Sequence, residues 1–235
     1  MSNFKFKHFT LRQGFSALKF GTDAMVLGAF ANQILPSSGS ILDVGTGTGA
    51  IALMVAQNYP CRFITGVEID ALSTLEACYN FSQAEFSAQL NVHHGDFFDL
   101  IANNAFDAVI SNPPYYKNSL LGTKDRVNVA KHSHTFSFPH FLKHAYELTN
   151  SEGTLMYIFP SEDLAFHQQE VHASGWFIRQ VIDIRSKGEQ SVRSILVASK
   201  VQTLVEQRNF TIRNQDNSYT VDYIDLTVDY HNKAL

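Results

Sequence analysis

The stretch "SILDVGTGTGAIALMVAQ", residues 40–57, decides the fold class of this chain. An apolar run ends here in three glycines at alternate positions, Gly45, Gly47 and Gly49, and a helical pattern begins directly after them. Glycines between a strand and a helix let the backbone turn tightly and let a ligand approach closely. In a parallel sheet such a loop lies at the carboxyl ends of the strands, where ligands bind. The stretch therefore predicts a strand, a ligand-binding turn and a helix.

The alternation of apolar strands with helical patterns continues along the chain. We expect strands at residues 40–44, 63–69, 91–95, 106–112, 153–160, 177–186 and 191–201, and helices at 22–34, 50–59, 71–83, 137–149 and 162–174. This order predicts an α/β fold with a mostly parallel, seven-stranded Rossmann-like sheet and helices on both faces. Only four residues join the last two strands, which predicts an antiparallel pair and one antiparallel edge strand.

The sequence is consistent with one domain over residues 1–235. We divide it into an N-terminal extension (1–39), a core (40–201) and a polar tail (202–235) that contains one alternating stretch at 219–228. No segment is rich enough in Gly or Pro to act as a linker, and a chain of 235 residues is long enough to bury a large core.

The composition of the chain argues against membrane-spanning, secreted and metal-binding proteins. Hydrophobic residues make up 45% and charged residues 17%, as in ordinary globular proteins. No run of about 18 apolar residues predicts a membrane span, and the N-terminus lacks the apolar block of a signal peptide. Cys61 and Cys78 fit no metal spacing, and the adjacent His93 and His94 have no ligand partner nearby in the sequence. We therefore expect a cytoplasmic protein without a metal.

An acid follows the second expected strand. Glu68 lies 19 residues after Gly49, where a carboxylate can accept hydrogen bonds from two ribose hydroxyls. The glycine spacing lacks the ending of the dinucleotide fingerprint, and Asp43 precedes the loop. The stretch resembles the motif of class I S-adenosylmethionine methyltransferases. That resemblance implies that Asp96, after the third strand, holds the adenine amine of the cofactor and that Phe97 lies against the adenine ring.

The run "FDAVISNPPYY", residues 106–116, ends an apolar strand with two prolines. The amine of an aromatic base is a poor nucleophile, because its lone pair is delocalised into the ring. Asn112 and the Pro113 carbonyl can accept its two N–H groups and favour a pyramidal nitrogen, while Pro114 helps to hold that carbonyl at a fixed angle. Tyr115 offers a face for stacking.

The segment from Asn112 to Tyr115 resembles motif IV of the amino-methyltransferases. In that fold the end of the fourth strand faces the reactive methyl group, so Asn112 is a candidate contact of both the substrate and the cofactor. The motif suits the amine of adenine, the amine of guanine and the side-chain amide of glutamine, and it does not choose among them.

Three further segments extend the resemblance over nearly the whole chain. They are "KFGTDAMVLGAF" (19–30), "RVNVAKHSHTFSF" (126–138) and "YTVDYIDLTVDYH" (219–231). With them the chain resembles the tRNA1(Val) adenine-N6 methyltransferase family, which modifies adenosine 37 beside the anticodon. Phe30 and Lys131 depart from the Trp and Arg that are usual in the family.

The resemblance implies S-adenosylmethionine as the cofactor and the anticodon stem-loop of a tRNA as the partner of a monomer. It also implies that Thr22 and Asp23 lie over the methionine portion of the cofactor, although Asp23 also suits a helix N-terminus, where the dipole favours an acid. An anticodon-loop purine is already unpaired, so extruding it costs less than flipping a base out of a duplex.

Basic residues are concentrated in two runs, although the formal net charge is −4. Residues 1–22 hold four Lys or Arg and no acid, and residues 117–131 hold four with only Asp125. Either run alone is also typical of a solvated surface. Phosphate contacts position an RNA, whereas stacking and amine contacts select a base. The candidate RNA contacts are Lys5, Lys7, Lys19, Arg126, Lys131 and His132.

Three other activities share some of these features. A glutamine-N5 protein methyltransferase is expected to carry a separate N-terminal helical domain, and only 39 residues precede the first strand here. A guanine-N2 RNA methyltransferase often carries a duplicated domain. A cofactor-binding module without catalysis has no need of the two amine acceptors at Asn112 and Pro113.

Overall fold

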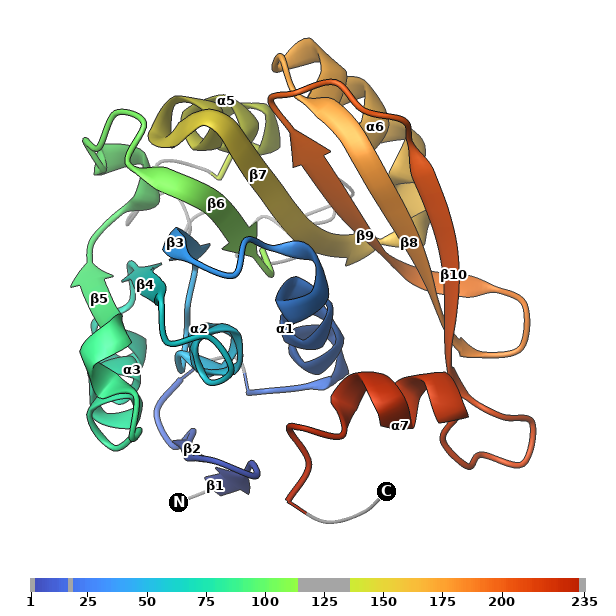
Figure 1. The fold of residues 1–235 in the computed structure, drawn as a ribbon, viewed down its shortest axis with the longest axis horizontal. Helices are drawn as coiled ribbons and strands as arrows, with labels where there is room; N and C mark the ends of the chain where they lie inside the picture. Colours follow the sequence, from blue (N-terminus) through green and yellow to red (C-terminus); the bar gives the residue numbers. More distant parts are fainter. Residues whose placement is uncertain (1–2, 17–18, 114–135, 233–235) are drawn as a thin grey trace, which may run out of the picture.

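The computed structural model describes residues 3–16, 19–113 and 136–232. A sheet of eight strands crosses the molecule in the order β10-β8-β9-β7-β6-β3-β4-β5 (Figure 1). Its strands are β3 (Gly39–Val44), β4 (Arg62–Glu68), β5 (Leu90–His94), β6 (Phe106–Ser111), β7 (Thr149–Pro160), β8 (Phe177–Lys187), β9 (Ser191–Ser199) and β10 (Glu206–Arg213). A separate antiparallel hairpin consists of β1 (Asn3–Lys5) and β2 (Thr10–Arg12).

Helices cover both faces of the sheet. They are α1 (Thr22–Ile34), α2 (Ala50–Ala56), α3 (Ala71–Ser82), α5 (Phe138–Leu148), α6 (Leu164–Ala173) and α7 (Val221–Thr227). Successive residues of a strand point to opposite faces, so Ile41 packs with α1 and α2 while Leu42 packs with α5. This two-sided burial explains why the strands read as continuous apolar runs. The predicted α/β class, with its mostly parallel sheet, is confirmed.

The antiparallel strand lies inside the sheet rather than at its edge. β9 pairs antiparallel with both β7 and β8, and β10, from the expected tail, forms the edge by pairing parallel with β8. β10 is held there because Phe210 is buried against α1, with its ring 4.9 Å from that of Phe30. As a consequence, the amino end of β9 lies at the same edge as the carboxyl ends of β7 and β8.

The alternating stretch at 219–228 contains a helix, α7. The Thr220 hydroxyl accepts a hydrogen bond of 3.1 Å from the Tyr223 N–H and caps the helix. Tyr223, Leu226 and Thr227 are its buried residues, at the three- and four-residue spacing of a helix face. In so short a segment, periods of two and of 3.6 residues are hard to tell apart.

No helix in the described part of the chain is long and apolar enough to cross a membrane.

Candidate active site

The glycine loop follows β3, and its three glycines have different roles. All three have positive φ angles, of 69° at Gly45, 55° at Gly47 and 81° at Gly49. A Cβ on Gly49 would lie 2.3 Å from a ring carbon of Phe81 on α3, so this glycine permits close packing. A Cβ on Gly45 or Gly47 would stand in open space. These two positions therefore leave the backbone accessible to a ligand.

Glu68 ends β4 and holds the loop through its carboxylate. One oxygen, Oε2, accepts a hydrogen bond of 2.9 Å from the Gly47 N–H, and Oε1 accepts one of 2.9 Å from the Asp70 N–H. An ionised carboxylate offers about four lone-pair sites, so it can accept further hydrogen bonds from ribose hydroxyls. The half-buried Glu68 is thus fixed beside the two accessible glycines.

Asp43, at the end of β3, contacts the glycine loop through its side chain. Its side chain is buried, and Oδ2 accepts a hydrogen bond of 2.7 Å from the Thr46 hydroxyl. Burial raises the pKa of Asp43 to about 7, the Thr46 hydrogen bond opposes this shift, and the nearby Glu68 charge adds to it. The contact fixes the side chain of one loop residue, Thr46, and so constrains the turn.

Asp96 and Phe97 stand where β5 ends. The Gly95 N–H donates to the Glu68 carbonyl at 2.9 Å, which brings this turn beside the end of β4. Asp96 caps a short 3-10 helix, Phe97–Asp99, by accepting from the Phe98 N–H at 3.0 Å. Phe97 is 7% exposed, and its ring lies 5.5 Å from that of Phe141. Asp96 is therefore near Glu68, whereas most of the Phe97 ring belongs to the core.

The end of β6 lies next to the glycine loop. Ser111 pairs with Val44 in the sheet, and its hydroxyl donates to the Val44 carbonyl at 2.9 Å. Asn112, half-buried, and Pro113, buried, follow directly. Pro114 and Tyr115 lie outside the described residues, as do Arg126, Lys131 and His132.

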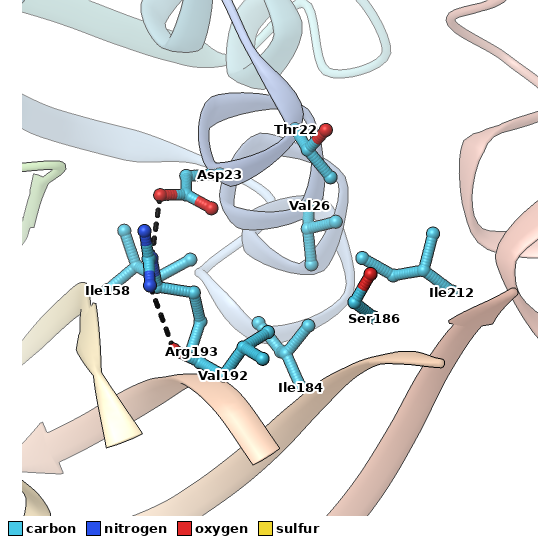
Figure 2. Close-up of a pocket in the computed structure, with 9 residues that line it drawn as sticks. All are labelled: Thr22, Asp23, Val26, Ile158, Ile184, Ser186, Val192, Arg193 and Ile212. Carbon is cyan, nitrogen blue, oxygen red and sulfur yellow. Dashed lines mark hydrogen bonds and ion pairs between the residues drawn. The ribbon is translucent and has the colours of Figure 1, made fainter. Parts of the chain in front are cut away.

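Thr22 and Asp23 begin α1 and line a pocket on the far side of β6 from the glycine loop. In that pocket Asp23 forms an ion pair with Arg193 on β9, with 2.9 Å between Oδ2 and Nε (Figure 2). The predicted position of Thr22 and Asp23 over the methionine portion of a cofactor stays a prediction.

Two polar residues on α3 hold the N-terminal segment against the site, and sequence reasoning missed both. The Glu76 carboxylate accepts from the Ser16 N–H at 3.0 Å and the Ser16 hydroxyl at 2.8 Å, and also from the backbone of Gly14 and Phe15. Asn80 accepts from the Arg12 N–H at 2.9 Å and donates to the Thr48 carbonyl of the glycine loop at 2.8 Å.

The pKa of Glu76 reflects this setting. Burial raises it, but the hydrogen bonds from Gly14, Ser16 and Phe15 together outweigh burial, and the pKa lies below its usual value. A signal in the sequence was available: Glu76 and Asn80, four residues apart, directly precede the buried Ala77 and Phe81 on the same helix.

The basic candidates at the N-terminus separate into two places. Lys7 pairs with Asp229 at 3.8 Å, and its N–H donates to the Tyr230 carbonyl at 3.2 Å. The Tyr230 hydroxyl contacts Asn32 in the last turn of α1, and α1 is about 20 Å long. Lys7, with Lys5 in the same hairpin, thus lies toward the end of α1 opposite to Asp23.

Lys19 is exposed and stands three residues before α1, close to Thr22 and Asp23. Within residues 3–16, 19–113 and 136–232, no three His, Cys, Asp or Glu side chains gather as a metal site requires.

Comparison with known proteins places the chain among methyltransferases. Residues 10–162 match the model of the methyltransferase small domain. A protein of Pseudoalteromonas translucida named tRNA1(Val) (adenine(37)-N6)-methyltransferase is 31% identical over 96% of this chain and 97% of its own length. A protein of the same name from Trichodesmium erythraeum is 32% identical over 99% of this chain and 98% of its own length.

Solved structures share the fold. A crystal structure from Agrobacterium tumefaciens, described as a predicted O-methyltransferase, has a TM-score of 0.69 with 21% identity and covers 91% of this chain and 98% of its own. M. jannaschii TYW2 in complex with AdoMet has a TM-score of 0.58 with 10% identity, and the match covers 84% of each chain.

Proposed function

The chain belongs to the methyltransferase small domain family and to the family of the tRNA1(Val) (adenine(37)-N6)-methyltransferases, and we propose that it transfers a methyl group to the N6 amine of adenosine 37 in the anticodon loop of a valine tRNA. Its methyl donor is S-adenosylmethionine, as in methyltransferases of this fold. The observation that carries the proposal is the contact between the two strand ends. Ser111 joins the end of β6 to Val44, so Asn112 and Pro113 begin where the glycine loop begins.

Different residues of the chain bind different parts of the cofactor in this proposal. Gly45 and Gly47 leave room for the backbone to approach the cofactor, and Glu68 is the acceptor for its ribose hydroxyls. Asp96, beside Glu68, is the candidate acceptor for the adenine amine. When bound, S-adenosylmethionine supplies an electrophilic methyl group on a sulfonium.

Asn112 and Pro113 activate the nucleophile. Their carbonyl oxygens accept the two N–H groups of the adenine amine, which favours a pyramidal nitrogen with an available lone pair. Both directly follow a central strand, which positions their backbone before the substrate arrives. Proximity then supplies a large share of the rate. The product ammonium loses its proton readily, so no strong general base is required.

The RNA contacts follow from the same proposal. Lys19, next to the first turn of α1, is the N-terminal candidate nearest the pocket, and Lys5 and Lys7 are candidates for a more distant part of the tRNA. Arg126, Lys131, His132 and a stacking Tyr115 complete the proposed set. We further propose that residues 1–235 act as one domain, as a monomer in the cytoplasm, and without a metal.

Methylation of a defined RNA tests the function. The purified chain is incubated with labelled S-adenosylmethionine and an anticodon stem-loop that carries adenosine 37, under single-turnover conditions. We expect methylation of this RNA and none of the inosine-37 RNA, which has no N6 amine. Equal methylation of both RNAs would contradict the proposed chemistry. Total tRNA and a purified release factor, run in parallel, separate the RNA activity from glutamine methylation.

A further inference from the structure

A pocket of about 230 Å³ lies between the first two turns of α1 and the strands β7 to β10 (Figure 2). Its apolar lining consists of Val26, Ile158, Ile184, Val192 and Ile212, and its polar lining of Thr22, Asp23, Ser186 and Arg193. A volume below the 300–1,000 Å³ of ordinary ligand sites suits one small planar group. Thr22 and Asp23 are also candidate cofactor contacts, whereas the apolar lining and Arg193 take no part in the proposed cofactor or catalytic contacts.

The pocket begins one strand away from the proposed amine acceptors. Ser111 on β6 pairs with Tyr157 on β7, so Ile158, in the pocket lining, lies level with Asn112. The other sheet residues of the lining come from β9, β8 and β10, the next strands in order. With about 4.8 Å between neighbouring strands, the middle of the pocket is roughly 10–14 Å from β6. The part of the lining on β9, β8 and β10 is therefore two to four strands away from an adenine held at Asn112, and it can contact a different group.

Arg193 forms one wall, and its plane is fixed. Its Nε donates to Asp23 at 2.9 Å and one terminal nitrogen donates to the Val192 carbonyl at 2.9 Å. A guanidinium that is held flat stacks well on a nucleobase, in addition to its attraction for phosphate. Lys19, an exposed cation, precedes the lining residue Thr22 by three positions in the sequence.

These observations all fit one kind of ligand. Resting on the proposed function, we infer that the pocket binds a nucleobase of the substrate RNA next to the target adenosine, between Arg193 and the Ile and Val side chains. An unpaired base combines a planar apolar face with a nearby phosphate, which matches the apolar lining and the cationic wall. Asp23 acts as a positioning residue that orients the guanidinium.

Abasic RNAs test the occupant directly. Stem-loops are made with adenosine 37 intact and the base removed from the 5′ or the 3′ neighbour, and their affinities for the chain are measured without methylation. We expect one of the two abasic RNAs to bind the wild-type chain about tenfold more weakly than intact RNA, which is within the range for loss of one stacked base. Equal affinity for all three RNAs would overturn the inference.

Variants locate the effect in the pocket. Arg193→Ala should weaken binding of intact RNA about tenfold and add little to the loss seen with the abasic RNA, because both changes remove the same contact. Arg193→Lys keeps the charge but not the plane and should resemble Arg193→Ala. Val192→Trp, at a side chain that is 40% exposed, should fill the pocket without disturbing the core and give the same loss. The matched control is Arg179→Ala, an exposed arginine near the other end of β8.

The cofactor is the alternative occupant of the pocket, and affinity measurements with the two ligands distinguish it from RNA. If Arg193→Ala lowers the affinity for S-adenosylmethionine and leaves RNA affinity unchanged, the pocket belongs to the cofactor and the inference is wrong. If intact RNA is bound but not methylated while the coupling between Arg193 and the abasic position persists, the proposed function fails and the pocket assignment stands.

Discussion

Glu68 connects two segments of the proposed cofactor site through a single side chain. Its two oxygens accept from Gly47 in the glycine loop and from Asp70 in the following turn. Because the donors lie on different segments, the carboxylate sets the distance between the loop and the end of β4. The same oxygens are the proposed acceptors for ribose, so the role in binding and the role in shaping the loop cannot be separated by removing the side chain alone.

Replacing Glu68 should weaken cofactor binding strongly. In Glu68→Gln the amide nitrogen would face one of the two N–H donors, so a hydrogen bond and the charge are lost together. Each charge-assisted hydrogen bond contributes roughly 1.5–3 kcal/mol, and we expect at least a tenfold loss of S-adenosylmethionine affinity, as for Glu68→Ala. Calorimetry measures it, with Glu152→Gln, an exposed acid on β7, as the control. Unchanged affinity would remove Glu68 from the site.

Asn112 should affect the reaction rather than cofactor binding. In the proposed mechanism its carbonyl oxygen accepts from the target amine and contacts neither the ribose nor the adenine of the cofactor. Asn112→Ala should therefore leave S-adenosylmethionine affinity nearly unchanged and lower the single-turnover rate by roughly 10²–10³, the scale for loss of one preorganised polar partner. Asn91→Ala, at an exposed residue of β5, is the control. Full activity of Asn112→Ala would reject the amine-acceptor mechanism.

At the scale of elements, α3 joins the N-terminal segment to the glycine loop. Asn80 contacts Arg12 on β2 and Thr48 in the loop, and the Glu76 carboxylate accepts hydrogen bonds from the backbone N–H groups of residues 14–16. The Glu76 side chain has no exposed surface. Because buried polar groups must keep their partners, residues 12–16 are fixed relative to the glycine loop.

The attachment predicts a local loss of order when Glu76 is changed. Glu76→Gln turns an acceptor into a donor that faces the N–H groups of Gly14 and Ser16, and unsatisfied buried donors cost about 1–3 kcal/mol each. Hydrogen exchange at residues 12–16 should accelerate, while the strands of the sheet stay protected. Glu85→Gln, at an exposed acid just after α3, should change neither. Exchange that is equally slow in Glu76→Gln and wild type would contradict the attachment.

At the scale of the whole molecule, two buried groups change the stability of the fold in opposite directions as pH changes. Burial raises the pKa of Asp43 from 3.8 to about 7 and lowers the pKa of His167 from 6.5 to about 4. The stability that Asp43 contributes is fully present below its unfolded pKa and is lost as pH rises toward 7. The contribution of His167 is fully present above 6.5 and is lost as pH falls toward 4. Between pH 5 and 6 the two trends oppose each other.

Removing either group should leave the pH dependence of stability that is due to the other. Each changes the free energy of unfolding by about 1.4 kcal/mol per pH unit in this window, with opposite sign. We expect Asp43→Asn to make stability rise with pH relative to wild type between pH 5 and 6, and His167→Phe, which keeps the contact with Phe159, to make it fall. Urea unfolding at several pH values measures the slopes, and groups common to all three proteins cancel in the comparison. Three parallel curves would show that neither pKa is shifted.

The sequence by itself determined the features that depend on neighbouring residues. Three glycines at alternate positions required the turn after β3, paired prolines ended β6 after Ser111, and continuous apolar runs between helical patterns defined the α/β class. Turn chemistry and hydrophobic period act over a few residues, so the residues around Glu68 and Asn112 were enough to assign both to strand ends.

Only the tertiary structure decided which strand ends meet. The insertion of β9 between β7 and β8 brings Arg193 to the edge where Asp23 lies, although 170 residues separate them in the sequence. Likewise, Glu76 meets Ser16 across 60 residues, and residues 206–213 become a strand because Phe210 can bury its ring on Phe30. Such contacts depend on the order and direction of strands, which follow from how apolar surfaces are shared across the whole molecule, and no local pattern encodes them.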